Sequence, residues 1–295
     1  MKNFRYRYHG LCVDSEFPLP EWASFESTDG HLPPDVLISV DRSNGSGELP
    51  ADSAEFRFFV RDAGWFTVRR GANIVVAPEV PRITRRLRAF LTGSAWGALL
   101  YQRNLLLLHA SAVETNAGAV LFCGRRGQGK STLAALLTEK GCKLISDDLC
   151  CVQLAGNKTP LVYPSAPRFK LWADSIHELG WDWNEPEQDH VRAGKFHYFR
   201  PSASALQPLP VRGIYLLGWG ETAFERLKGF SALSRIFNAA TWRGDLLVSA
   251  GDPADFFSQC TELVGRIPVW EFRRPRQFTA IHETTDLLMG HLSQN

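Results

Sequence analysis

One stretch of eight residues combines glycines, a lysine and a hydroxyl group in an order that suits phosphate binding. Residues 124–131 read GRRGQGKS and fit the pattern G-x-x-x-x-G-K-[ST]. The glycines let successive backbone N–H groups point at phosphate oxygens, and the helix that follows presents its positive end to them. Lys130 can bridge two phosphates of a triphosphate, and the Ser131 hydroxyl can bind Mg²⁺. The alternative is a glycine-rich turn with an incidental lysine and serine.

The residues on either side of this stretch favour phosphate binding. An apolar, strand-like run covers 119–123, and a helical pattern covers 131–138 and stops at Gly141. A strand, a glycine-rich loop and a helix in this order are the context that the motif requires. We therefore expect a nucleoside triphosphate site. Its phosphate-binding residues are expected to be Gly124, Arg125, Arg126, Gly127, Gln128, Gly129, Lys130, Ser131 and Thr132.

Two adjacent carboxylates, Asp147 and Asp148, end the run KLISDD. We expect the strand over 143–148 to lie beside the strand that leads into the loop, with its carboxyl end at the phosphate-binding edge. Adjacent residues of an extended chain point to opposite sides, so one carboxylate can bind a metal while the other faces an incoming hydroxyl. We expect Asp147 and Ser131 to bind the metal, and the spacing leaves open which aspartate is the base. Two acidic turn residues in solvent are the alternative.

A histidine, His109, ends the apolar run over 105–108. Taken alone, a histidine at the end of an apolar strand is more often a core or edge residue than a functional one. The guanine-reading pattern N-K-x-D has one partial match, because residues 157–160 read NKTP and lack the carboxylate. A switch-type GTPase is therefore not expected. Ordinary P-loop ATPases place their metal-binding aspartate further along the chain than this acid pair.

Three motifs together resemble the catalytic domain of the HPr kinase/phosphorylase family: LHASAV at 108–113, the loop at 124–131 and SDD at 146–148. The resemblance implies an α/β fold with a P-loop kinase core of the HPr kinase/phosphoenolpyruvate carboxykinase type. It also implies that the histidine and the acid pair surround the γ-phosphate of ATP, and that an aspartate is the base toward a serine. These roles fall on His109, Lys130, Asp147 and Asp148, with Mg²⁺ bound by the loop hydroxyl and an acid. The Gly-Arg-Asn stretch that supports phosphorolysis in that family is not found.

A second resemblance covers nearly the whole chain. The segments YRYHGL at 6–11, FPLPE at 17–21 and PSAPRFKLW at 164–172 resemble HPr-kinase-like proteins that accompany lasso-peptide biosynthesis genes. This resemblance implies that the substrate is the C-terminal serine of a precursor peptide. Basic residues late in the domain are candidates for substrate or anion binding, with exposed surface positions as the alternative. They are Arg168, Lys170 and Lys195.

The remaining patterns indicate two domains, a small β-rich unit over 1–80 and a catalytic α/β domain over 81–295. Strands are expected within the first domain, and a loop at 42–47 separates two of them. They cover 4–11, 35–40, 55–62, 65–70 and 73–77. An apolar stripe predicts a helix over 83–99, and the arginines that precede it should find acidic partners. Further helices are expected over 174–179, 231–240, 253–266 and 277–292, with a buried strand over 211–219 and a loop over 181–188.

Composition excludes several classes of protein. The chain has 295 residues, of which 44% are hydrophobic, and a formal net charge of +2. No bulk charge calls for a nucleic-acid or membrane partner. The six cysteines form no CxxC pair, which indicates a reduced, cytoplasmic protein. We expect a kinase that acts on a peptide or small protein, with a homo-oligomer possible. The alternatives are a small-molecule kinase and a non-catalytic, nucleotide-gated binding module.

Overall fold

The computed structural model describes residues 3–29, 33–42, 55–156, 158–182, 187–189, 192–201 and 204–294. The chain has a mixed α/β fold that divides into two compact units. The first unit comprises residues 1–105 and 243–256, and the second comprises 106–242 and 257–295. The division therefore falls after residue 105 and not after residue 80. The reason is that the helices over 85–102 pack on strands of the first unit.

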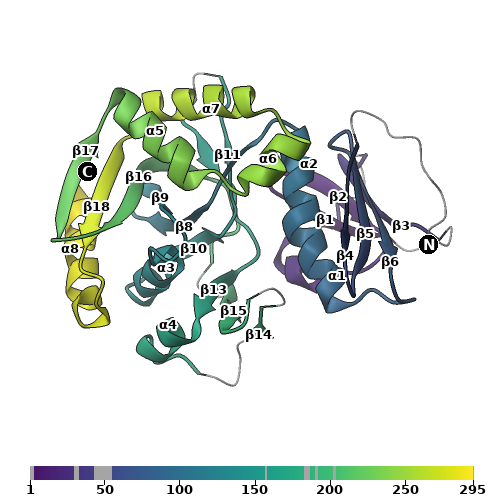
Figure 1. Ribbon diagram of the computed structural model, residues 1–295, viewed down its shortest axis with the longest axis horizontal. Coiled ribbons are helices and arrows are strands. Elements are labelled where there is room, and N and C mark those ends of the chain that lie inside the picture. The colour runs from purple at the N-terminus through teal and green to yellow at the C-terminus, as the bar shows by residue number, and fades with distance from the viewer. Residues whose placement is uncertain are drawn as a thin grey trace. The chain divides into compact units, whose positions relative to one another are not determined.

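The first unit contains a six-stranded sheet with the order β1-β2-β3-β6-β5-β4 (Figure 1). The strands are β1 (Phe4–Tyr8), β2 (Leu11–Ser15), β3 (Val36–Val40), β4 (Glu55–Val60), β5 (Gly64–Arg69) and β6 (Asn73–Pro78). The expected strand over 4–11 is two strands. His9 and Gly10 both have positive φ angles, 49° and 79°, and this is the geometry of a two-residue hairpin turn. Most of the expected loop at 42–47 lies outside the described residues.

Helical segments complete the first unit. They are η1 (Pro20–Phe25), α1 (Arg85–Phe90), a π-helical turn (Leu91–Ala95), α2 (Trp96–Gln102) and α6 (Gly244–Ala250). The expected helix over 83–99 is thus present and continues to residue 102. The expected acidic partner exists for Arg88, whose Nε lies 3.0 Å from an oxygen of Glu21. The indole of Trp96 donates a hydrogen bond to the buried His9, at 3.1 Å.

The second unit is built on a nine-stranded sheet with the path β10-β8-β9-β16-β12-β11-β7, to which β18 and then β17 add on the side of β16. Its strands are β7 (Leu106–Leu108), β8 (Ala110–Thr115), β9 (Gly118–Cys123), β10 (Lys143–Asp147), β11 (Cys150–Gln153), β12 (Leu161–Val162), β16 (Leu209–Trp219), β17 (Ala223–Leu227) and β18 (Val269–Arg274). A small sheet is formed by β13 (Arg168–Trp172), β15 (Lys195–Phe199) and β14 (Glu187–Gln188). The last of these lies within the expected loop over 181–188.

The expected adjacency of β10 and β9 is wrong, because β8 lies between them. β8 and β9 form an antiparallel hairpin, and β10 then pairs antiparallel with the free edge of β8. Two antiparallel steps leave β10 parallel to β9. The carboxyl ends of β9 and β10 therefore still meet at the same edge of the sheet, which is the part of the expectation that positions the acid pair.

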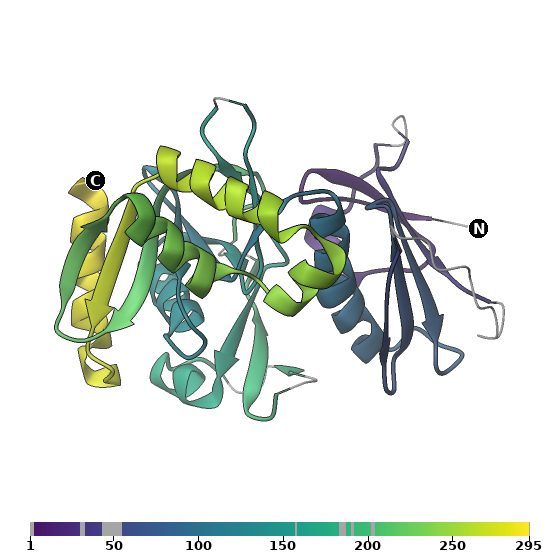
Figure 2. The same ribbon diagram turned by 45° about the horizontal axis from the view of Figure 1, so that its top comes forward.

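The helices described in the second unit, or entering it, are α3 (Lys130–Glu139), α4 (Ala173–Glu178), α5 (Gly229–Ala240), α7 (Pro253–Arg266) and α8 (Ile281–Gln294), the last preceded by the short η4 (Phe278–Ala280). The expected helices over 174–179, 231–240, 253–266 and 277–292 are therefore confirmed to within a few residues. β17, β18 and α8 lie side by side in two views (Figures 1 and 2). The ring of His291 stacks on Phe224 of β17 at 4.1 Å.

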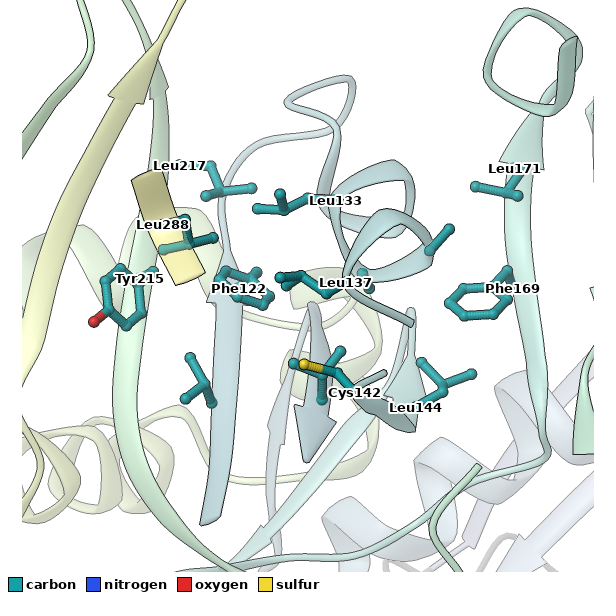
Figure 3. Packing of buried hydrophobic residues seen from close by; sticks show 14 of the residues in the cluster. Phe122, Leu133, Leu137, Cys142, Leu144, Phe169, Leu171, Tyr215, Leu217 and Leu288 are labelled. Carbon is teal, nitrogen blue, oxygen red and sulfur yellow. The ribbon is translucent and has the colours of Figure 1, made fainter. Parts of the chain in front are cut away.

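The main apolar core of the second unit surrounds α3. Leu133 and Leu137 of α3 lie between Phe122 and Leu217 of the large sheet on one side and β13 on the other (Figure 3). This packing fixes the first turn of α3 against the end of β9. The loop between them is consequently anchored at both ends.

All six cysteines are buried and free. Within the described part of the chain, no helix is both long and apolar enough to cross a membrane.

Candidate active site

The loop over 124–131 connects the end of β9 to the start of α3 and depends on glycine at two positions. Gly124 and Gly129 have φ angles of 153° and 70°, which other residues rarely adopt. A Cβ at Gly129 would lie 2.8 Å from Nη2 of Arg274, and one at Gly124 would lie 2.5 Å from Oε1 of Gln128. That same Oε1 accepts a hydrogen bond from the backbone N–H of Arg125, at 2.6 Å. The side chain of Gln128 therefore joins the middle of the loop to its start by a hydrogen bond.

Lys130 lies inside the loop and is only 7% exposed. Its ammonium donates to the carbonyl oxygens of Gly124, at 2.8 Å, and Arg125, at 3.3 Å. An ammonium has three donors, so one remains for a ligand. Burial lowers the pKa of Lys130. Lys130 thus lies inside the loop, and its role in binding an anion stays a prediction.

Asp147, the last residue of β10, is held by three hydrogen bonds. Its Oδ1 accepts from the hydroxyls of Ser111, at 2.6 Å, and Ser131, at 2.9 Å. Its Oδ2 accepts from the backbone N–H of Lys170, at 2.7 Å. The carboxylate thus lies directly behind the first turn of α3, next to the hydroxyl that the sequence assigns to the metal.

Asp148 has different surroundings and a different backbone. Its φ of 75° lies in the left-handed region, so the expected extended conformation ends at Asp147. A non-glycine residue held there is strained, and such strain gathers at functional sites. Its Oδ2 accepts from Nζ of Lys170, at 2.9 Å, and its Oδ1 lies 3.6 Å from Nε2 of His109. The two carboxylates still face different groups, but through a turn of the backbone and not through strand alternation.

The electrostatics keep Asp148 ionised and His109 neutral. Burial by itself would raise the pKa of Asp148, but Lys170, His109 and Lys195 outweigh it and hold this pKa well below its usual range. Burial, together with the charge of Lys130, lowers the pKa of His109 to about 4. At neutral pH the imidazole can therefore accept or donate a hydrogen bond without carrying charge.

Lys130, Asp148 and His109 open onto one cavity of about 230 Å³, which we call the loop cavity. Its described lining includes seven basic residues: Arg126, Lys130, Lys170, Arg192, Lys195, Arg274 and Arg276. Of the described residues, only two acidic ones, Asp148 and Asp174, line it. This balance of charge favours an anionic ligand. The rest of the lining includes His109, Gly127, the loop from Gly129 to Thr132 and the aromatic residues Trp172, Trp219 and Phe278.

The structure separates the three candidate anion-binding residues. Lys170 and Lys195 both line the loop cavity. Lys195 is 8% exposed and, among the described residues, makes no ion pair; its ammonium lies 6.0 Å from the ring of Trp172. Arg168 does not line the cavity and instead contacts Nδ1 of His197, at 3.3 Å. Thr132 of the loop motif uses its hydroxyl on Ser175, at 3.0 Å.

Several residues of the site were not expected from the sequence. Ser111 lies within the HASA motif, but the sequence pattern indicated His109, two positions before it, and not this serine. Trp172, Arg192 and Trp219 had no spacing signal. Arg274 lies in the run RRPR over 273–276, and a basic run directly after an apolar strand is the signal that could have marked it.

Among the described residues, no cluster of three or more histidine, cysteine or acidic side chains could hold a metal ion. The donor set does fit Mg²⁺ in combination with a phosphate ligand, because Mg²⁺ prefers oxygen and is commonly bound by one or two carboxylates plus substrate phosphates. Ser131 and Asp147 supply such oxygens 2.9 Å apart at the end of the loop.

Comparison with known proteins gives little at the level of sequence. No protein-family model and no curated protein matches the chain. Among solved structures, the HPr(Ser) kinase/phosphatase from Coxiella burnetii is similar over 64% of this chain and 97% of its own, with 14% sequence identity and a TM-score of 0.35. At this TM-score the two folds are only distantly alike.

Proposed function

We propose that the protein is a kinase that transfers the γ-phosphoryl group of ATP to a serine hydroxyl with the help of Mg²⁺. The observation that carries this proposal is the arrangement around the acid pair. Asp147 is hydrogen-bonded to the loop hydroxyl of Ser131, while Asp148 faces the same cavity as Lys130. A phosphate-binding loop with a carboxylate across a shared cavity is what transfer to a hydroxyl needs.

Asp147 and Ser131 would hold Mg²⁺ together with phosphate oxygens of the nucleotide. When bound, the metal neutralises the charge of the phosphates. The protein's own part is to hold both oxygens in place. Ser111 and the backbone of Lys170 orient the Asp147 carboxylate, and the first turn of α3 orients the Ser131 hydroxyl. Lys130 binds phosphate oxygens from inside the loop.

Asp148 would accept a hydrogen bond from the acceptor hydroxyl and so orient the hydroxyl oxygen toward the γ-phosphorus. In the transfer, the new bond joins the serine oxygen to phosphorus and the bond from phosphorus to the β,γ-bridging oxygen breaks, so that ADP leaves. The hydroxyl proton passes to Asp148 and then to water. Because the low pKa of Asp148 makes it a weak base, its main contribution is orientation, which suffices when the transition state is loose.

The acceptor side of the cavity is basic. Lys195 and Arg192 line it, and Lys195 interacts with the charge of Asp148 but makes no ion pair among the described residues. A serine at the end of a peptide carries its carboxylate on the carbon next to the one that bears the hydroxyl. Such an acceptor would place an anion within reach of these cations when the hydroxyl meets Asp148. This supports the more particular proposal, drawn from the sequence resemblance, of the C-terminal serine of a lasso precursor peptide.

The proposal is tested with two peptides that differ only at the end. One ends in serine with a free carboxylate, and the other ends in the same serine as an amide. After incubation with Mg-ATP, mass spectrometry should show a gain of one phosphate on the free acid and at least tenfold less on the amide. Lys130→Ala should abolish both, since it removes the phosphate-binding charge, and full activity in that variant would refute the site.

Two additional measurements separate this proposal from the two alternatives. ATP consumption on a panel of small hydroxylated metabolites, with none on either peptide, would favour a small-molecule kinase. ATP binding without transfer to any acceptor would favour a nucleotide-gated binding module. The presence of Asp148 and His109 in the same cavity as Lys130 argues against that module, because a purely gating site has no need of a second carboxylate and an imidazole at the loop.

A further inference from the structure

A buried arginine from the far end of the chain lies against the phosphate-binding loop. Arg274 is the last residue of β18, which runs parallel to β16. β16 in turn runs parallel to β9, the strand that leads into the loop. The carboxyl ends of all three strands therefore meet at one edge of the sheet, and ligands of open α/β sheets bind at that edge. Arg274 pairs in register with Trp219, the last residue of β16.

The guanidinium of Arg274 is clamped in place. Its Nη2 donates to the backbone carbonyl of Gln128 in the loop, at 2.7 Å, although the two residues are 146 positions apart. Its central carbon lies 4.7 Å from the ring centroid of Trp219 and 5.7 Å from that of Phe272. The residue is 3% exposed, and it belongs to the lining of the loop cavity. Its position is thus set by a strand end, two rings and the loop itself.

In the part of the chain that the structure describes, this cation has no counter-ion. Among the described residues, no carboxylate forms an ion pair with Arg274, and its buried Nη1 has no hydrogen-bond partner. Burial lowers the pKa of this guanidinium to about 10, so it is charged at neutral pH. A buried charge without a partner is costly, and proteins keep one where an anion arrives to pair with it. The adjacent residue, Arg273, shows the usual arrangement, with Glu225 and Glu271 at 3.2 and 2.7 Å.

We propose that Arg274 is a phosphate-binding residue of the loop, which pairs with the polyphosphate tail of the nucleotide through the N–H groups that the protein leaves unpaired. The inference rests on the proposed function in one respect, that a triphosphate occupies the loop. A planar guanidinium suits phosphate oxygens because it offers parallel donors. Through its bond to Gln128, the same side chain also holds the loop in the shape that points N–H groups at the phosphates.

The test measures ligand affinity by calorimetry, with Mg-ATP and with inorganic tripolyphosphate as separate probes. Arg274→Met keeps an unbranched apolar stem and removes the charge. We expect it to raise the Kd for both probes by roughly ten- to a hundredfold, since hydrogen bonds to charged groups carry an effect of this size. The fold-change should be the same for the two probes, because the contact is with phosphate and not with the base. Arg274→Lys, which keeps the charge but not the planar pair of donors, should lose affinity to a smaller extent.

Arg273→Met is the matched control, because it removes a neighbouring arginine from the same strand that already has acidic partners. It should leave both Kd values within twofold of wild type. Circular dichroism establishes that each variant is folded. If Arg274→Met does not fold, the two Kd values are measured on Arg274→Lys alone. Wild-type affinity for both probes in the folded Arg274 variants would overturn this inference and leave the kinase proposal intact. Failure of the wild-type protein to bind either probe would overturn both.

Discussion

Asp147 and Asp148 are neighbours in the chain, yet their carboxylates have different surroundings. Asp147 accepts hydrogen bonds from two serine hydroxyls and a backbone N–H, and it is not among the residues that line the loop cavity. Asp148 lines the cavity and is paired with Lys170. The left-handed backbone at Asp148 turns its side chain away from the direction that a continuing strand would give. This supports Asp148 as the group that meets the acceptor.

Substitution of each aspartate by asparagine should therefore affect different steps. Asp148→Asn should leave the Kd for Mg-ATP within about threefold of wild type and lower kcat by roughly 10²–10⁴, the usual contribution of a positioned acid or base. Asp147→Asn should instead weaken Mg²⁺-dependent ATP binding, because it alters the oxygen beside Ser131. The measurements are calorimetric binding with and without Mg²⁺ and initial rates on the phospho-acceptor. Equal effects of both variants on binding would contradict this division of roles.

At the scale of elements, two helices support the site from the same core. α3 carries the end of the loop, and Leu133 and Leu137 bury it against the sheet and β13. α8 adds Leu288 to this core, while its neighbour Leu287 is 49% exposed. Adjacent leucines on one helix thus have opposite environments. The amphipathic pattern of α8 explains why the sequence predicted this helix well.

These two leucines give a matched test of the core. Leu288→Ala should lower the free energy of unfolding by about 2–5 kcal/mol, since it removes buried apolar contacts and leaves a cavity. Leu287→Ala should change it by less than about 0.5 kcal/mol, as for most exposed positions. Urea unfolding followed by circular dichroism measures both values. A loss of similar size in the two variants would mean that α8 does not pack through Leu288.

At the scale of the whole molecule, buried histidines link stability to pH in both units. In the first unit, burial lowers the pKa of His9 from 6.5 to about 3. In the second unit, burial is again the main cause that lowers the pKa of His109 and His197 to about 4. The folded state therefore binds fewer protons than the unfolded state between these values and 6.5. Stability is full above about pH 6.5 and is lost as the pH falls toward 4.

His9→Asn isolates one of these contributions. Asparagine does not titrate and tolerates the positive φ of this turn. Between pH 7 and pH 5, wild-type protein should lose about 2 kcal/mol more stability than this variant, as a pKa difference of this size implies. The exposed His177→Asn is the control and should follow wild type. Urea unfolding is monitored by tryptophan fluorescence, to which Trp22 and Trp96 of the first unit contribute. Parallel pH profiles for wild type and His9→Asn would contradict the assignment.

The amino-acid sequence by itself determined the local secondary structure of this protein. The loop over 124–131, the strand before it and the helix after it occur where the sequence predicts them, because their conformations depend on glycines and apolar periodicity within a few residues. The same holds for most strands of the first unit and for α4, α5, α7 and α8.

Only the tertiary structure decided how distant segments meet. It inserted β8 between β9 and β10, assigned the helices over 85–102 to the first unit and brought Arg274 to the loop. It also distinguished Lys170 and Lys195, which line the cavity, from Arg168, which does not. These outcomes depend on strand order, register and the packing of side chains remote in sequence. Local residue patterns specify none of these, because the energy of such contacts exists only once the sheet has assembled.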